Sequence, residues 1–143
     1  MEMTPQRVRG AEFHTVRKGA DPDGIRVFLS AVADELEQQA DPAWQWKGRH
    51  AQLIDGCCFT LPDTPENQAT YPQPPHQLRG IAFPLARITV LLSLATGACH
   101  DLAMAPYKGK GTGETTLLRR MYETFKPGDV ILADALFDNY YLV

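Results

Sequence analysis

The sequence has few cysteines, which argues against a disulfide-stabilised protein and against a cysteine-rich zinc site. Three cysteines occur among 143 residues, and Cys57 and Cys58 are adjacent. Such a set cannot make a disulfide framework, so we expect a reducing, cytoplasmic setting. Adjacent cysteines also lack the gap of about two to four residues that lets two thiolates reach one zinc ion. Strand or core positions are therefore favoured over a zinc site with Cys99 and His100.

The sequence also lacks a long apolar run. The longest one, residues 81–98, is interrupted by Pro84, Arg87 and Ser93, which makes it unsuitable for crossing a bilayer. The first residues contain no apolar stretch typical of a signal peptide. We therefore expect no membrane partner.

An excess of positive charge is absent as well. The net charge is −3, whereas most isolated DNA-binding domains are basic, so charge alone does not favour a nucleic-acid partner. Hydrophobic residues make up 44% of the chain and charged residues 22%, which is enough for a packed core. The length fits one ordinary domain.

Hydrophobic periodicity predicts an α/β chain. Ile25, Phe28 and Val32 belong to a helical repeat that predicts a helix over residues 22–39. Further along we expect strands over 48–55, 87–96 and 99–107, a helix over 114–125 and a short strand over 130–133. Five prolines between Leu61 and Pro75 predict a loop without regular structure. We expect two parts, a helical lead-in over 1–45 and a second part over 46–143.

Two tryptophans and a group of cations each have two possible interpretations. Trp44 and Trp46 would share one face of a strand, so core packing is the default and base stacking the alternative. Several cations gather in the second half of the chain, and a solvated helix face is favoured over the wall of a DNA channel. These cations are Lys108, Lys110, Arg119, Arg120 and Lys126.

Two predicted strands end in an aspartate, Asp55 after Leu53-Ile54 and Asp134 after Leu132-Ala133. Chemistry in an α/β sheet gathers at strand ends, where a rigid backbone projects side chains into a crevice. Two carboxylates on neighbouring strand ends can share Mg²⁺ ions that clamp the reacting oxygens of a phosphodiester. The structural alternatives are an Asp-Gly turn at Asp55 and a cap or turn at Asp134.

These aspartates lie within a longer pattern of residues. Leu53-Ile54-Asp55-Gly56, residues 61–67, Tyr71-Pro72-Gln73 and residues 83–87 resemble the first half of the catalytic domain of bacterial DDE transposases of the IS-four type. Leu132-Ala133-Asp134, followed by Phe137 and Tyr140-Tyr141, resembles the segment around that family's second catalytic aspartate. The resemblance covers about residues 46–143.

The resemblance implies part of an RNase H-like fold, with three antiparallel strands, a helix, and a fourth strand beside the first. It implies that Asp55 and Asp134 are catalytic and hold Mg²⁺ or Mn²⁺. It also implies that a full-length relative cleaves DNA and transfers strands between transposon ends and target. The resemblance leaves open whether the full-length relative forms a homodimer.

The family's third acid is a glutamate on a later helix, and no glutamate follows Asp134 in this sequence. Glu114 and Glu123 precede Asp134 and do not match that position. We therefore expect a truncated catalytic domain that is inactive alone. Two other functions stay open: a DNA-binding regulator that inhibits a full-length transposase, and a metal-dependent nuclease that uses Asp101 or Asp138 as a further acid.

Overall fold

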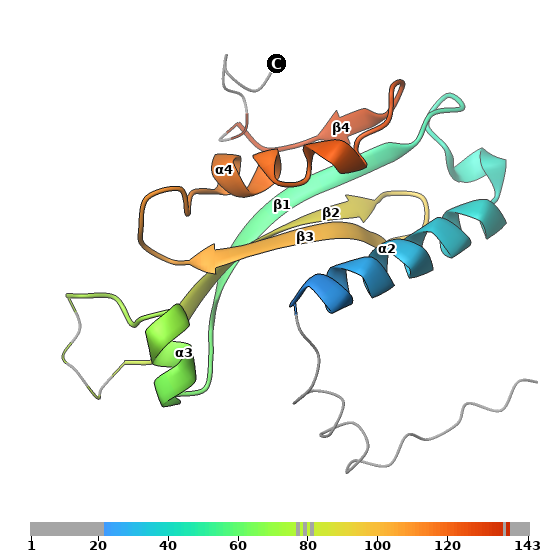
Figure 1. Cartoon of the computed structure of the whole chain (residues 1–143). Helices are drawn as coiled ribbons and strands as arrows, with labels where there is room; N and C mark the ends of the chain where they lie inside the picture. The colour runs from blue at the N-terminus through green and yellow to red at the C-terminus, as the bar shows by residue number, and fades with distance from the viewer. Residues whose placement is uncertain (1–21, 77, 79, 81, 136, 138–143) are drawn as a thin grey trace, which may run out of the picture.

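The computed structural model describes residues 22–76, 78, 80, 82–135 and 137. Within them a four-stranded sheet is combined with short and long helices (Figure 1). The order along the chain is α2 (Pro22–Gln39), η1 (Pro42–Trp44), β1 (Ala51–Thr60), α3 (Pro65–Thr70), β2 (Leu85–Ser93), β3 (Cys99–Pro106), α4 (Glu114–Arg119), η2 (Tyr122–Thr124) and β4 (Val130–Leu132). The prediction of an α/β chain with a leading helix is confirmed.

The sheet is mixed, with the strand order β3-β2-β1-β4. β1 pairs antiparallel with β2, and β2 pairs antiparallel with β3. β4 pairs with β1 in parallel, which requires the chain to cross over the sheet between β3 and β4. The predicted order of three antiparallel strands, a helix and a fourth strand beside the first is therefore present.

One face of the sheet, which we call the helix face, carries the core. Alternate side chains of neighbouring strands, including Ile54 and Leu91, point to this face and pack against α4. The buried cluster consists of Ile54, Leu91, Ala103, Ala105, Leu117, Leu118, Met121 and Phe137. The opposite face, which we call the open face, bears residues such as Leu53, Asp55 and Val90, and these are only half-buried or exposed.

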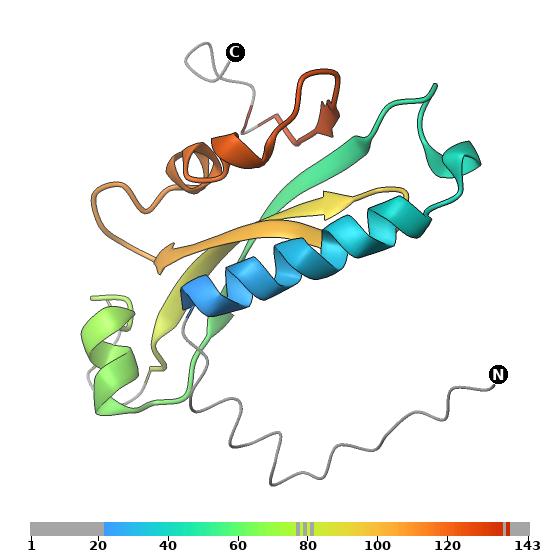
Figure 2. The same ribbon diagram turned by 45° about the vertical axis from the view of Figure 1, so that its right-hand side comes forward.

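Helix α2 runs alongside β3 (Figures 1 and 2) and meets it through polar side chains. Arg26 donates hydrogen bonds of 2.8 and 3.0 Å to the carboxylate of Asp101 in β3. The apolar residues that predict the helix lie largely on its outer side, where Phe28 is 66% exposed. The predicted bounds of the helix are confirmed, but its apolar repeat points mainly away from the sheet.

Two predictions about local structure are wrong. The first strand does not stop at Asp55, since β1 continues through Gly56, which pairs with Thr89 in extended conformation. The proline-rich segment is not wholly irregular, since α3 forms within it. Thr64 caps α3 by accepting a hydrogen bond from the Asn67 amide, and Pro65 stands in the first turn, where a missing N–H costs nothing.

Two further predictions need correction. The second helix is shorter than the predicted residues 114–125, because α4 ends at Arg119 and the chain continues as the 3₁₀ turn η2. Trp44 and Trp46 are not core residues, being 60% and 53% exposed. Neither lies on a strand of the sheet: Trp44 ends η1, and Trp46 begins a tight turn before β1.

Candidate functional site

Asp55 projects from the middle of β1 onto the open face. Its neighbours Ile54 and Gly56 point to the helix face, and alternation along the strand directs Asp55 the other way. The side chain is exposed, and its Oδ1 accepts a hydrogen bond of 2.8 Å from the Gly56 amide. The backbone of Asp55 is paired with Val90 of β2, so its carboxylate projects from a rigid strand.

Asp134 follows β4 by two residues, and the register of the sheet relates it to Asp55. The parallel pairing matches Ala51 with Val130 and Leu53 with Leu132. The pairing ends there, so Asp55 and Asp134 each lie two residues beyond the last matched pair, Leu53 and Leu132. Both aspartates are exposed, and they follow neighbouring parallel stretches of β1 and β4.

Glu114 lies on the other side of β1. Its Cδ is only 2.8 Å from the point where a Cβ on Gly56 would lie, so this carboxyl covers the helix face of the strand. Arg87 of β2 holds it there, with a separation of 3.7 Å between Arg87 Nε and Glu114 Oε1. Glu114 therefore lies on the opposite side of β1 from Asp55. Among the residues that the structure describes, no three His, Cys, Asp or Glu side chains are placed to hold a metal ion together.

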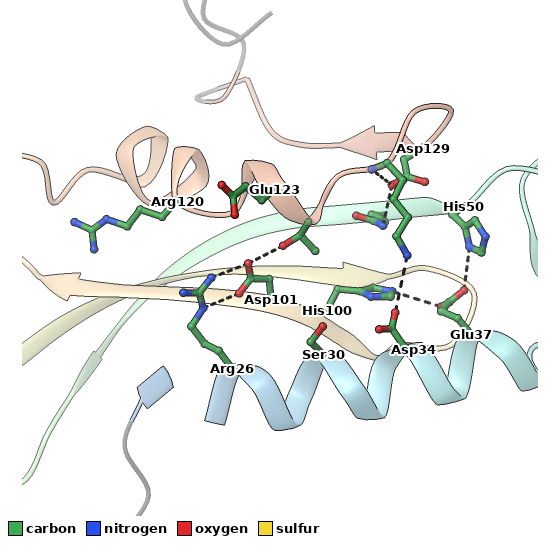
Figure 3. A pocket seen from close by; sticks show the side chains of 13 residues that line it. Arg26, Ser30, Asp34, Glu37, His50, His100, Asp101, Arg120, Glu123 and Asp129 are labelled. Atoms are coloured by element: carbon green, nitrogen blue, oxygen red, sulfur yellow. Dashed lines mark hydrogen bonds and ion pairs between the residues drawn. The ribbon is translucent and has the colours of Figure 1, made fainter. Parts of the chain in front are cut away.

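A polar cavity of about 360 Å³ lies between α2 and the α4–η2 segment, on the helix face (Figure 3). At one end Asp101 binds Arg26 and accepts a hydrogen bond of 2.9 Å from the hydroxyl of Thr124. Burial alone would raise the pKa of Asp101, but the hydrogen bonds from Arg26, Thr124 and the Leu102 amide outweigh burial and lower it. Asp101 thus serves as an ionised anchor between α2, β3 and η2.

At the other end of the cavity, Glu37 lies between two histidines (Figure 3). Its carboxylate is 3.1 Å from His50 Nδ1 and 3.7 Å from His100 Nε2, and it accepts a hydrogen bond of 2.9 Å from Thr96. Burial opposes ionisation here too, but the hydrogen bonds, including those with Ser93 and Thr96, lower the pKa of Glu37. The sequence pattern did not indicate this network.

These placements bear on the nuclease alternative. Asp101 points to the helix face and is engaged with Arg26, so it is not beside Asp55 on the open face. The helix-face register confirms this, because Asp101 pairs with the core residue Leu91. Asp138 lies outside the described residues. Asp55 and Asp134 therefore remain the carboxylate pair on which a functional proposal can rest.

The structure also locates the other residues that the sequence singled out. Cys57 and Cys58 are exposed positions of β1, so the strand interpretation is confirmed and the core interpretation is wrong. The cations of the second half are all exposed, as a solvated surface requires. They are Lys108, Lys110, Arg119, Arg120 and Lys126. In the part of the chain that is described, no helix has the length and apolar character needed to cross a bilayer.

Comparison with known proteins finds two similar sequences, both from Escherichia coli K12. The transposase InsG of insertion sequence element IS4 is 28% identical over 109 residues, which is 76% of this chain and 24% of InsG. A protein named "Putative transposase InsZ" is 31% identical over 93 residues, which is 64% of this chain and 30% of InsZ.

The chain is therefore distantly related to transposases of the IS4 type, as its sequence pattern indicated. It spans between about a quarter and a third of the length of these relatives. No family model matches the sequence, and no solved structure matches it.

Proposed function

We propose that residues 46–143 form the first part of an RNase H-like catalytic domain of a DNA transposase, with residues 1–45 as a helical lead-in. Asp55 and Asp134 are two of its metal-binding carboxylates. The observation that supports this proposal is the parallel register of β1 and β4, which, if it continued for two more residues, would bring the two aspartates opposite each other. The relation to IS4-type transposases supports the reaction class, and the strand order β3-β2-β1-β4 supports the fold.

The donor set on the open face fits a hard divalent cation. Both side chains are exposed carboxylates, and oxygen ligands are those that Mg²⁺ and Mn²⁺ prefer. Mg²⁺ is commonly bound through one or two carboxylates while it keeps several waters, so two protein ligands are compatible with binding. When bound, such ions supply charge stabilisation and activate the attacking oxygen in phosphodiester displacement.

The protein's own contribution is to fix the carboxylates in place. Asp55 stands on a strand with neighbours on both sides, and the hydrogen bond from the Gly56 amide orients its Oδ1. On the helix face of β1, Glu114 of α4 packs over Gly56 and pairs with Arg87 of β2. A carboxylate that is oriented before the ligand arrives loses little freedom on binding, which is the basis of preorganised sites.

Two carboxylates are one fewer than the three that the family uses. We therefore expect this chain alone to bind divalent ions weakly and not to cleave or join DNA. Incubation with transposon-end DNA and Mg²⁺ or Mn²⁺ tests this, and specific cleavage would show that the chain holds a complete site. Binding of DNA without cleavage would agree with the regulatory alternative, in which the chain restrains a full-length transposase.

The direct test of the proposed site is a titration of the chain with Mn²⁺, followed by the spin-resonance signal of the free ion. We expect binding to weaken at least about tenfold in Asp55→Asn and in Asp134→Asn, because each substitution removes an anionic ligand. Glu123→Gln is the matched control, since Glu123 is an exposed acid on the far side of the sheet. Equal affinity in all variants would refute the assignment.

A further inference from the structure

The chain makes a tight turn before it enters β1, which we call the tryptophan turn (residues 44–49). The backbone N–H of Trp46 donates to the carbonyl of Arg49 over 3.1 Å, and the N–H of Arg49 donates back over 3.0 Å. Lys47 and Gly48 between them have φ values of 53° and 72°. Two central residues with positive φ define a type I′ turn, which is the most compact way to reverse a strand.

Both tryptophans of the chain lie in this turn, and both are exposed. Trp44 and Trp46 are 60% and 53% exposed, and they are the two tryptophans in the sequence. Figures 1 and 2 show the segment between α2 and β1 reaching beyond the end of the sheet. Large aromatic side chains on a protruding turn are well suited to meet a partner, because they lose little freedom on binding.

The backbone of the turn is strained at a lysine. A residue with a side chain is uncommon at positive φ, and type I′ turns favour Asn-Gly or Asp-Gly instead. Lys47 occupies the position that asparagine would fill more easily, and its Nζ lies 4.7 Å from the centroid of the Trp46 ring. Strain of this kind is a reason to look for a function of the side chain.

The charge of the turn differs from that of the whole chain. No acidic residue occurs between Asp41 and Asp55, whereas Lys47, Arg49 and His50 fall in that interval. The chain as a whole has a net charge of −3. Exposed indole rings interleaved with cations form the combination by which proteins hold unpaired nucleic acid, with stacking on bases and ionic contact to phosphates.

We propose that the tryptophan turn binds DNA at unpaired bases, with Trp46 or Trp44 stacking on a base and Lys47 and Arg49 contacting the backbone. This inference rests on the proposed transposase function and adds the surface that DNA contacts. The turn is also fixed to the sheet where β1 and β4 begin. Arg49 donates to the Gly128 carbonyl before β4, and the Val130 amide donates to the carbonyl of His50.

The position of the turn suits contact with DNA that also reaches the aspartates. The turn ends just before Ala51, and Asp55 follows Ala51 by four residues of extended strand, about 13 Å at the usual rise. That span corresponds to about four nucleotide steps along a strand. One DNA strand can therefore contact the turn and pass the open face of β1.

Intrinsic fluorescence tests the inference, because every tryptophan signal comes from the turn. The full chain is titrated with a short oligodeoxythymidylate and with a blunt duplex, while the anisotropy of a labelled copy of each DNA reports binding. We expect the single strand to quench the emission and to bind more tightly than the duplex. Trp46→Ala should weaken single-strand binding about five- to 150-fold, the range for losing one base stack.

Two further variants separate stacking from folding. Lys47→Asn suits the turn geometry and should keep the fold, while the slope of log K against log salt decreases by about 0.7 for a lost phosphate contact. Phe83→Ala is the matched control, since Phe83 is an exposed aromatic in a different loop, and its affinity should equal that of the unchanged chain. Equal affinity in Trp46→Ala and in the unchanged chain would overturn the inference.

The outcomes also separate this inference from the proposed function. DNA binding that leaves tryptophan emission unchanged would overturn the role of the turn and leave the transposase proposal standing. Emission that responds to protein concentration instead of DNA would assign the turn to contact between two copies of the chain, which also overturns the inference. The transposase proposal is tested separately, and it fails if Mn²⁺ binding is independent of Asp55 and Asp134.

Discussion

Gly56 in β1 is a position where a side chain would crowd Glu114. An added Cβ would approach the Cδ and Cγ of Glu114 to 2.8 and 3.0 Å, so the Glu114 side chain would have to move and its ion pair with Arg87 would weaken. An Asp-Gly turn was one alternative for Asp55 and Gly56, whereas the glycine lies within β1 and allows close packing. Glycine in a strand often marks such a close approach.

We predict that Gly56→Ala is coupled to Glu114 by about 1 kcal/mol in the free energy of unfolding. In the unchanged chain the substitution should be neutral or destabilising, since crowding offsets the entropy that alanine saves. In a Glu114→Ala background it should stabilise the fold by about 0.5 kcal/mol. A double-mutant cycle in urea measures the coupling, and additive effects would contradict the packing of Glu114 on Gly56.

Helix α2 shows where sequence periodicity gives the element but not its orientation. Its bounds follow from helical spacing and agree with the structure, because periodicity within one segment is local information. Which side meets the sheet depends on partners far away in the chain. The inward side carries Arg26, whose partner Asp101 is 75 residues away in the sequence, and Glu37, whose partner Thr96 is 59 residues away.

The orientation of α2 gives a prediction about two apolar residues. Phe28→Gln should change the free energy of unfolding by less than about 0.5 kcal/mol, because Phe28 is 66% exposed. Leu91→Ala should cost about 3 kcal/mol, because Leu91 is fully buried in the core under α4. Chemical denaturation of both variants checks the contrast. A cost for Phe28→Gln as large as that for Leu91→Ala would mean that the apolar side of α2 faces the sheet.

The polar contacts of α2 predict a dependence of stability on pH. The pKa of Asp101 and that of Glu37 are lowered from their ordinary values of 3.8 and 4.5, so folding favours the ionised forms. Their contribution is fully present above those values and is lost as pH falls through the lower pKa values of the folded chain. We therefore expect stability to be level between neutral pH and about pH 5, and to decline below about pH 4.

Asp101→Asn identifies the source of that decline. At neutral pH it should cost about 2 kcal/mol, because the charged hydrogen bonds from Arg26 weaken, and the cost should shrink in acid. Asp63→Asn is the matched control, since Asp63 is exposed and its carboxylate accepts a hydrogen bond of 2.7 Å from the nearby Gln68 side chain. Urea unfolding at a series of pH values measures both, and a cost that does not vary with pH would contradict the ionised anchor.

Some features of the whole molecule can be predicted from the sequence, and others cannot. The order of the four strands and of α2 and α4 follows from local patterns in the sequence. The prediction of Asp55 and Asp134 as a site comes from such patterns and from a family resemblance. The exposure of Trp44 and the polar network around Glu37 do not follow, because they depend on how distant segments pack. The register of β1 and β4 is also not predictable from local sequence, since it depends on how the connection through α4 crosses the sheet.

The central claim is that the β1–β4 register joins Asp55 and Asp134 in one divalent-ion site on the open face. The most direct test is the amide NMR spectrum of the labelled full chain during addition of Mn²⁺ in small amounts. We predict that the signals around Asp55 and Asp134 broaden first and together, and that Asp55→Asn removes the effect at both. Broadening centred instead on Glu37, Asp101 and Asp129 of the polar cavity would contradict the account.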